Sequence, residues 1–475
     1  EARDRVGAAL VNAGFVLPPR RWTVNLSPAD VRKDGPGFDL PIAIGVLVAS
    51  GQLPPDAVDG LWFLGELGLD GQVRAVRGTL PFAQAAQRGG ARCAVIPEAN
   101  AAEAALLRTL PVACAGSFRA LIEALRTRRL VPHRSSAAPT DLASSRTDGD
   151  DGSAAEGDLA DVVGQRIAKR ALEIAAAGGH NLLMLGPPGA GKTMLARRLA
   201  GLLPPLDDAA FLDVVTIHSV GGLLPAGRTP SQRPPFRAPH HTISLAGLIG
   251  GGPGPRPGEV SLAHRGVLFL DELLELPRYI LDAMRQPLED GRVVIARAAQ
   301  SVPFPARFLL VGAANPCPCG LAADPDGRCR CSEAAIRAYR ERLSGPLADR
   351  IDLHVRVEAV ALETLRERAT GESSAVIRAR VLAARAHQAR RYRSLPGVTL
   401  NTEVPGAWLR AAGGITAPAP ALALLVTAAE RLRLSARGFD RALRVARTVA
   451  DLEDRAEVDE AAISEALMFR AEAPG

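Results

Sequence analysis

The sequence is poor in cysteine and lacks any long apolar run. Its 475 residues include six cysteines, too few for a disulfide scaffold in a chain of this length. No apolar run approaches the roughly 20 residues that a membrane span requires, and no secretory-signal pattern stands at the start. These absences exclude the membrane-spanning and disulfide-stabilised classes. We expect a cytoplasmic protein whose natural start precedes Glu1.

Aromatic residues and lysines are also scarce. Three Tyr and three Trp leave few platforms for base stacking, which argues against sequence-specific recognition of single strands. The 57 basic residues comprise three lysines, Lys33, Lys169 and Lys192, and therefore 54 arginines. Because arginine is the default basic residue here, each lysine is informative. The formal charge of +6 permits binding to nucleic acid or another polyanion without requiring it.

Composition and pattern divide the chain. Residues 133–158 contain no aromatic and one large aliphatic residue, which predicts a flexible linker after an N-terminal domain, 1–132. A strand, a glycine loop, a helix and returning strands then predict an α/β domain with a doubly wound parallel sheet over 159–357. Helical patterns predict a separate all-α domain over 358–475.

The N-terminal domain alternates strand-like and helix-like segments. Residues 21–28 have the period of a strand, residues 40–50 read as a buried helix or strand, and residues 61–76 predict a hairpin around Asp70-Gly71. Two further segments, 79–90 and 99–110, predict helices on either side of a short strand at 93–97. An α/β or α+β domain follows, with no catalytic constellation.

The strongest motif matches G-x-x-x-x-G-K-T. It follows an apolar strand and opens a helix, the context of a phosphate-binding loop. Glycines allow backbone N–H groups to wrap the phosphates, and the helix N-terminus adds positive charge. Lys192 is expected to reach the β- and γ-phosphates and the Thr193 hydroxyl to bind Mg²⁺; a chance glycine-rich turn is the alternative. The expected nucleotide-binding residues here are Gly186, Pro187, Pro188, Gly189, Ala190, Gly191, Lys192, Thr193 and Met194.

Polar residues end two later buried strands. Asp271 and Glu272 follow the run VLFL, and Asn315 follows FLLVGAA. We expect Asp271 to hold Mg²⁺, Glu272 to orient and deprotonate the attacking water, and Asn315 to lie between that water and the γ-phosphate. Alone, each strand end is equally typical of solvated acids or a turn. Their order after the glycine loop predicts a magnesium-dependent ATPase.

Four cysteines lie close together in the sequence. Cys317 and Cys319 form one C-x-C pair, and Cys329 and Cys331 form another. Four thiolates are typical of a closed structural Zn²⁺ site, although C-x-C is tighter than the usual C-x₂-C. Unligated thiols on a loop are the alternative.

Two segments are candidates for sequence-neutral contact with DNA phosphates. One is a Gly/Pro-rich insertion, 212–262, which contains Arg237, His240 and His241. The other is the stretch 377–393, with six arginines and no acid. A solvated helix face is the alternative for the second segment.

The run PPFRAPHHTISLAGLIGGGPGPRPGEVSLAHRGVLFLDE, residues 234–272, resembles the magnesium-chelatase-like branch of the AAA+ ATPases. The chain as a whole resembles the ComM/YifB family of that branch, associated with natural transformation and branch migration of DNA. The resemblance implies an AAA+ domain with an all-α lid, preceded by an S16 (Lon protease)-like domain. It implies a DNA-acting ring motor, a hexamer, with ATP and Mg²⁺ as cofactors. A magnesium chelatase motor subunit and an ATP-dependent unfoldase are the alternatives.

The resemblance also assigns residues. Asp161-Val162-Val163-Gly164-Gln165 resembles the segment that packs near the adenine, so Val163 and Gly164 are expected at the nucleotide. Asp349-Arg350-Ile351-Asp352 and Ser435-Ala436-Arg437 resemble motifs whose arginines enter the ATP site of a neighbouring subunit. Surface ion pairing is the alternative for Arg350 and Arg437.

The S16 resemblance carries a further expectation about proteolysis. In that family a serine and a lysine form the catalytic dyad, and the matching runs here are 33–39 and 76–80. The first run contains no serine, and Leu80 occupies the lysine position. Proteolysis by that mechanism is therefore not available, and we expect a binding or assembly module.

Overall fold

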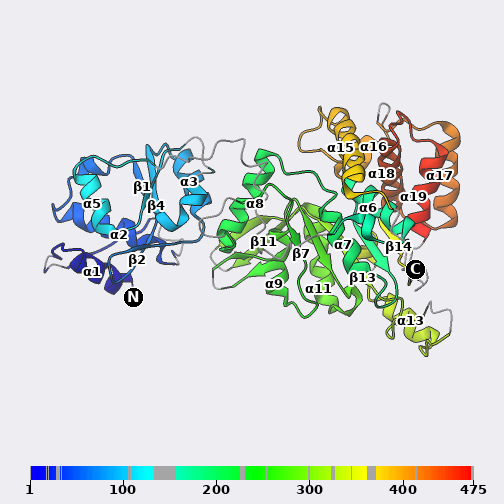
Figure 1. Ribbon diagram of the computed structural model, residues 1–475, viewed down its shortest axis with the longest axis horizontal. Coiled ribbons are helices and arrows are strands. Elements are labelled where there is room, and N and C mark those ends of the chain that lie inside the picture. Colours follow the sequence, from blue (N-terminus) through cyan, green and yellow to red (C-terminus); the bar gives the residue numbers. More distant parts are fainter. Residues whose placement is uncertain are drawn as a thin grey trace.

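A computed structural model shows a molecule with three parts in a row (Figure 1). An N-terminal part lies at one end, a parallel sheet with its helices lies in the middle, and a group of helices lies at the other end. No helix in the described part of the chain is long and apolar enough to cross a membrane. The structure describes residues 2–17, 19, 21–27, 33, 35–104, 106, 110–132, 157–224, 230–252, 254–297, 300–322, 327–343, 345–360, 371–411 and 414–471. Of the linker expected at 133–158, only residues 157 and 158 are among them.

The N-terminal part is built on a three-stranded parallel sheet in the order β1-β4-β5. These strands are β1 (Leu61–Phe63), β4 (Cys93–Pro97) and β5 (Val112–Ala115). A two-stranded hairpin, β2 (Glu66–Leu67) with β3 (Val73–Arg74), lies beside the sheet. The helices are α1 (Ala2–Asn12), α2 (Asp39–Ala49), α3 (Thr79–Arg88), the short α4 (Ala101–Ala104) and α5 (Phe118–Arg126).

Three local predictions for this part need correction or refinement. Residues 21–27, the described part of the segment 21–28 that was predicted as a strand, form no strand and are mostly exposed. The segment 40–50 is helical, as α2. The hairpin around Asp70-Gly71 is present, but β1, the first part of the expected hairpin, pairs in parallel with β4 instead. Period-two patterns mark residues that can form a strand, whereas pairing depends on which strands the tertiary fold brings alongside.

The middle part contains a five-stranded sheet in the order β14-β6-β13-β10-β7. Every pair of neighbours in it is parallel, which confirms the predicted α/β class. Apolar residues dominate its inner strands because a parallel sheet is covered on both faces. The strands are β6 (Leu182–Leu185), β7 (Phe236–Arg237), β10 (Val267–Leu270), β13 (Leu309–Ala314) and β14 (Leu353–Arg356).

Helices of the middle part and of the C-terminal part surround this sheet. The middle part contributes α6 (Arg166–Gly178) and α7 (Lys192–Ala200), while its helix α8 (Asp208–Gly221) packs on α3 of the N-terminal part. The helical C-terminal part consists mainly of α15 (Ser374–Arg391), α17 (Ala419–Arg431), α18 (Ala436–Leu452) and α19 (Glu460–Ala471). Helices α15 and α18 pack on α6, and one continuous apolar core joins them to the sheet. The C-terminal helices therefore share a core with the five-stranded sheet.

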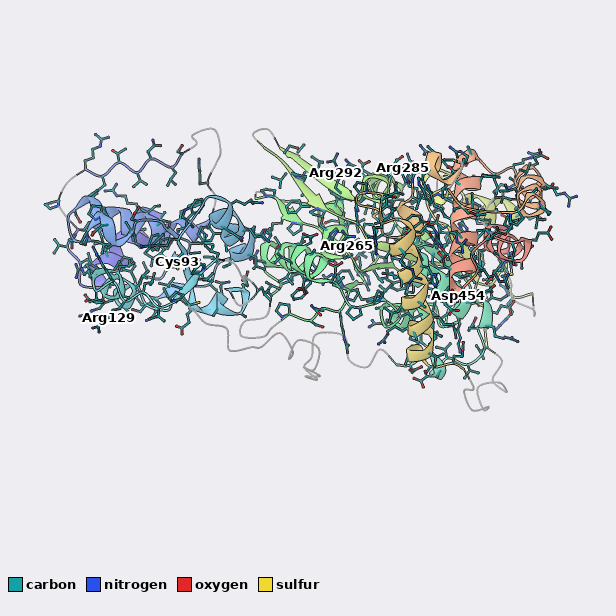
Figure 2. The ribbon with its side chains drawn as sticks, turned by 90° about the horizontal axis from the view of Figure 1, so that it is seen from above. Cys93, Arg129, Arg265, Arg285, Arg292 and Asp454 are labelled. Carbon is teal, nitrogen blue, oxygen red and sulfur yellow. The ribbon has the colours of Figure 1, made fainter. Side chains whose placement is uncertain are left out.

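Shorter elements connect these layers. An antiparallel hairpin, β11 with β12, joins β10 to β13 and extends from the body near the labelled Arg292 (Figure 2). The connecting elements are β8 (Gly250–Gly251), β9 (Arg256–Pro257), β11 (Arg292–Arg297), β12 (Gln300–Pro305), α9 (Leu245–Ile249), α10 (Glu259–Leu262), α11 (Arg278–Ala283), α12 (Arg285–Asp290), α13 (Glu333–Arg340), α14 (Gly345–Ala348) and α16 (Gly406–Leu409).

The N-terminal part contacts the middle part through α3 and α8. Leu80, the residue at the position of the S16 lysine, is fully buried in an apolar cluster that contains Phe211 and Val214 of α8. Polar contacts surround this cluster: Ser219 Oγ donates to Glu103 Oε2 at 2.5 Å, and Gln84 Nε2 donates to Thr216 Oγ1 at 3.2 Å. The position that carries the catalytic lysine in the resembled proteases therefore holds an apolar side chain here, which packs between two parts of this chain.

Leu80→Lys is expected to separate the N-terminal part from α8. Burial of the new ammonium group among apolar side chains would cost roughly 2–5 kcal/mol, and Glu103, the acid beside the cluster, already accepts from Ser219. Small-angle X-ray scattering should show a larger radius of gyration for this variant. Leu69→Lys is the matched control, because Leu69 is 56% exposed. An unchanged scattering profile for Leu80→Lys would contradict the packing role.

Candidate nucleotide site

Three neighbouring strands of the central sheet end at one edge with polar residues. The phosphate loop follows β6, Asn315 follows β13, and Asp271 follows β10. Because these strands are adjacent and parallel, their carboxyl ends meet, and this edge is where ligands bind in open α/β sheets. The structure thus brings together residues separated by more than 120 positions in the chain.

Glycine is required at specific points of the phosphate loop. Gly189 and Gly191 have φ angles of +76° and +89°, a region that residues with a side chain rarely adopt. Gly186 has an ordinary φ angle, but a Cβ atom there would lie 2.1 Å from the carbonyl oxygen of Val357. Because a side chain is disfavoured at all three of these positions, the loop can form a tight turn with its backbone N–H groups accessible to phosphate oxygens.

Lys192 lies at the centre of the site and is largely buried. Its Nζ atom donates to the carbonyl oxygens of Gly186 and Pro187, at 2.7 and 2.9 Å, and to Asn315 Oδ1 at 3.3 Å. Burial lowers the pKa of Lys192, and the nearby carboxylates of Asp271 and Glu272 oppose that shift. The ammonium group is therefore held between the loop that would bind phosphate and the strand tip of Asn315.

Thr193 and Asp271 form the pair expected to hold Mg²⁺. The Thr193 hydroxyl donates to Asp271 Oδ2 at 2.8 Å, and the other carboxylate oxygen accepts from the backbone N–H of Glu272 at 2.9 Å. Hydroxyl and carboxylate oxygens are the hard ligands that Mg²⁺ prefers. The residues present therefore fit a magnesium ion between the phosphate loop and the tip of β10.

Glu272 is held by a residue of the insertion. Its φ angle is +50°, a conformation uncommon outside glycine, and it turns the side chain away from the strand direction. Glu272 Oε2 lies 2.9 Å from Nδ1 of His241, which follows the neighbouring strand β7. The rings of His240 and His241 lie against each other at an angle of 32°, with centroids 4.1 Å apart. The sequence motifs did not predict this contact between His241 of the insertion and Glu272.

The segment expected near the adenine lies beside the phosphate loop. Gly164 and Gln165 have positive φ angles, of 65° and 54°, which form a tight turn before α6. Gln165 Nε2 donates to the carbonyl oxygen of Glu358 at 2.6 Å, next to the Val357 carbonyl that limits Gly186. Val163 belongs to the same turn, and Met194 is 45% exposed on α7.

Arg350 and Arg437 lie together at the opposite edge of the sheet. Arg350 precedes the amino end of β14, and its carbonyl oxygen accepts from Asn181, which precedes β6. Its guanidinium pairs with Glu289, and Arg437 lies 3.6 Å from the same carboxylate. The side-chain hydrogen bond from Arg350 lowers the pKa of Glu289. The sequence motifs did not predict Glu289 as a partner of Arg350, because the two residues are 61 positions apart in the chain.

A buried ion pair supports the Arg350 segment. Burial would raise the pKa of Asp352, but Arg441 and His180 outweigh it and lower that pKa below its usual range. Arg441 Nη1 donates to Asp352 Oδ1 at 2.5 Å, and Asp352 also accepts from the backbone N–H of Asn181. Helix α18, which carries Arg437 and Arg441, is therefore tied to the strand that Arg350 precedes.

The two candidate DNA segments differ in what their side chains contact. His240 and His241 are exposed, whereas Arg237 forms a two-point ion pair with Glu259, at 2.6 and 2.8 Å. In the stretch 377–393, several arginines bind acceptors within the chain, while Arg378, Arg390 and Arg393 are also exposed. Four such contacts are Arg378 to Gly201, Arg380 to Glu173, Arg385 to Ala176 and Arg391 to Asp451. Contact between this segment and DNA phosphates therefore stays a prediction.

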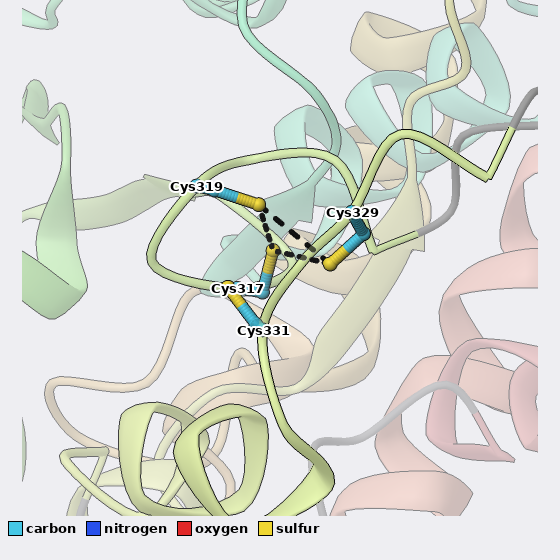
Figure 3. Close-up of side chains that lie close together, drawn as sticks. All are labelled: Cys317, Cys319, Cys329 and Cys331. Carbon is cyan, nitrogen blue, oxygen red and sulfur yellow. Dashed lines mark hydrogen bonds between the residues drawn. The ribbon is translucent and has the colours of Figure 1, made fainter.

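The four clustered cysteines lie on the segment between β13 and α13, directly after Asn315. Their sulfur atoms face one another around a common centre (Figure 3). Cys317 is buried and Cys319 exposed.

Comparisons with known proteins agree along the whole chain. The family described as magnesium chelatase, subunit ChlI, matches residues 158–365. Related models for the ChlI subunit and its C-terminal region match residues 1–100 and 371–470.

Relatives of similar length match nearly all of the chain. The competence protein ComM of Haemophilus influenzae is 42% identical over 99% of this chain and 89% of its own. The protein YifB of Escherichia coli is 40% identical over the same shares. An uncharacterised protein of Mycobacterium tuberculosis is 46% identical over 99% of this chain and 90% of its own. A shorter match, 29% identical over 43% of this chain, is to Lon protease 2 of Bacillus subtilis.

Proposed function

Since this chain belongs to the ComM/YifB family of magnesium-chelatase-like AAA+ ATPases, we propose that it is a ring motor that hydrolyses ATP to move along DNA. The work we propose for it is branch migration during recombination, in natural transformation and in other strand exchange. The relative from H. influenzae is described as a competence protein, which supports this assignment.

The proposed hydrolysis uses the residues at the strand tips. Backbone N–H groups of the loop 186–193 and the Lys192 ammonium bind the phosphates, while Thr193 and Asp271 hold Mg²⁺, which neutralises charge on the β- and γ-phosphates. Glu272 takes a proton from the attacking water as its oxygen bonds to the γ-phosphorus. The bond to the bridging oxygen breaks, and ADP leaves with that electron pair. Asn315, 3.3 Å from Lys192 Nζ, is placed to orient the water.

The positions of two arginines support an assembly. Arg350 and Arg437 lie beyond the amino end of β14, whereas the phosphate loop follows the carboxyl end of β6 in the same sheet. A strand of this length spans about 13 Å, so neither arginine reaches the nucleotide of its own subunit. We propose that they enter a neighbour's site, where a fixed delocalised cation suits a transferring phosphoryl group, and that six subunits close the ring.

The observation that carries the motor proposal is the 2.9 Å contact between His241 and Glu272. It joins an exposed part of the insertion to the acid that would activate water. DNA bound at His240 and His241 would draw His241 away and free Glu272 for catalysis, so that hydrolysis responds to DNA.

ATPase assays with and without a four-way DNA junction test this function. We expect the junction to stimulate hydrolysis, and His241→Ala to raise the DNA-free rate and abolish most of the stimulation. Arg129→Ala, which changes an exposed residue of the N-terminal part outside both candidate DNA segments, is the control and should behave as wild type. Stimulation only by a porphyrin-loading partner would instead favour a magnesium chelatase motor, and no response to DNA would sink the motor proposal.

A further inference from the structure

Four cysteine sulfurs lie within 4.8 Å of one another in the segment that follows Asn315. Three of the separations are 3.4 Å between Cys317 and Cys319, 3.8 Å between Cys317 and Cys329, and 3.6 Å between Cys319 and Cys329. Figure 3 shows the side chains of all four cysteines converging from two strands of the loop. Cys317 and Cys329 are twelve positions apart in the sequence, so the fold of the loop sets this arrangement.

These separations match one ligand class. Four sulfurs placed 2.3 Å from a central ion in a tetrahedron lie about 3.8 Å apart. A disulfide requires about 2.05 Å between sulfurs, and all four cysteines are free. An iron–sulfur cluster divides its thiolates among several iron atoms, which demands a wider set than this one. A single tetrahedral ion therefore fits this donor set best.

The backbone around the first pair is shaped to present sulfur. Gly320 has a φ angle of +80° and its N–H donates to the carbonyl oxygen of Cys317 at 2.9 Å, closing a turn around Cys319. Two arginines adjoin the second pair in the sequence: Arg328 precedes Cys329, and Arg330 lies between Cys329 and Cys331. Four negative thiolates gathered in one place require compensation of this kind.

The cysteine segment touches the nucleotide site. A Cβ atom on Gly320 would lie 2.7 Å from Cδ of Pro188, so the turn packs directly on the phosphate loop. Cys317 is two residues beyond Asn315, whose Oδ1 accepts from Lys192. An ion that fixes the four cysteines would therefore also fix two neighbours of the triphosphate.

We propose that Cys317, Cys319, Cys329 and Cys331 bind one Zn²⁺ in a closed site that braces the phosphate loop and Asn315. The ion closes the segment between β13 and α13 into a rigid unit, and Gly320 passes that rigidity to Pro188. The proposed binding of zinc does not depend on the proposed function. Only the effect of zinc on nucleotide binding rests on the proposed function.

Metal analysis of the full chain, purified without chelators, tests the binding. We expect about one zinc ion per chain, and replacement by Co²⁺ should give the visible absorption of tetrahedral thiolate ligands. Cys319→Ser/Cys331→Ser should lose the metal, whereas Cys114→Ser, which changes a thiol on β5, should keep it. Wild-type protein without zinc that gives no cobalt spectrum would overturn the proposal, as would iron in place of zinc.

Nucleotide titration under reducing conditions tests the bracing. The double variant, or wild type stripped of zinc, should bind a fluorescent ADP analogue roughly tenfold more weakly, equivalent to one lost interaction of about 1.4 kcal/mol. Returning zinc should restore the affinity of the stripped wild type but not of the variant. An unchanged affinity with zinc removed would overturn the bracing role. Wild type that holds zinc but binds no nucleotide would count against the proposed ATPase instead.

Discussion

Glu272→Gln is expected to reduce ATP hydrolysis by about 10²–10⁴-fold while leaving ATP binding nearly intact, the effect typical of removing a general base. The amide keeps the size of the side chain and can still meet His241, but it cannot accept the proton of the attacking water. Turnover is measured by phosphate release, and binding by titration with a fluorescent ATP analogue.

Lys192→Ala should weaken ATP binding as well as hydrolysis, because the binding of the phosphates depends on this side chain. Lys192 Nζ donates to two loop carbonyls and to Asn315, so its removal leaves the phosphates without their cation and the loop without its cross-link. Glu275→Gln, which changes an acid one turn further along, is the control for Glu272→Gln and should retain activity. Normal turnover in either Lys192→Ala or Glu272→Gln would remove the basis of the ATPase assignment.

Arg350→Ala is expected to abolish hydrolysis, by about 10³–10⁵-fold, with little change in ATP binding by the same subunit. The reason is its position: the guanidinium lies at the opposite edge of the sheet from its own phosphate loop. Arg437→Ala offers a variant with less risk to folding, because the Arg437 side chain is 68% exposed. Arg129→Ala, at the far end of the molecule in Figure 2, is the matched control.

Mixing experiments separate action on a neighbour from a structural role. An Arg350→Ala subunit keeps Glu272, and a Glu272→Gln subunit keeps Arg350, so a site between them contains both groups. In rings assembled at random from equal amounts, about a quarter of the sites would be complete in this way. Activity should therefore reappear on mixing two inactive proteins. Mixtures as inactive as their components would contradict the trans role.

Glu289 gives these arginines a partner before a neighbour arrives. It pairs with Arg350 and lies within 3.6 Å of Arg437, on a surface that also lines a groove of about 880 Å³ at the amino edge of the sheet. A γ-phosphate entering from an adjacent subunit would compete with this carboxylate for both guanidinium groups. Glu289 thus holds both guanidinium groups near the amino edge of the sheet, from which a phosphate of the neighbouring subunit could displace it.

Local sequence determined the elements of the nucleotide site. The glycine loop, the two acids and Asn315 each end an apolar strand, and a strand of this kind is recognisable from its own residues. Their meeting at one edge follows from the parallel order of strands, a property of the α/β class that the pattern predicts. The α/β class was confirmed because the sheet that these strands form is parallel throughout.

The tertiary structure decided the contacts between distant residues. The pairing of His241 with Glu272 spans 31 positions, that of Arg350 with Glu289 spans 61, and that of Ser219 with Glu103 spans 116. No period or motif encodes such partners, because they depend on how strands and helices pack. For the same reason, the arginines of α15 looked like a basic stripe in the sequence, although several of them bind acceptors within the fold. Likewise, the sequence indicated only that Leu80 replaces the lysine of the resembled proteases. Its packing against α8 became apparent from the structure.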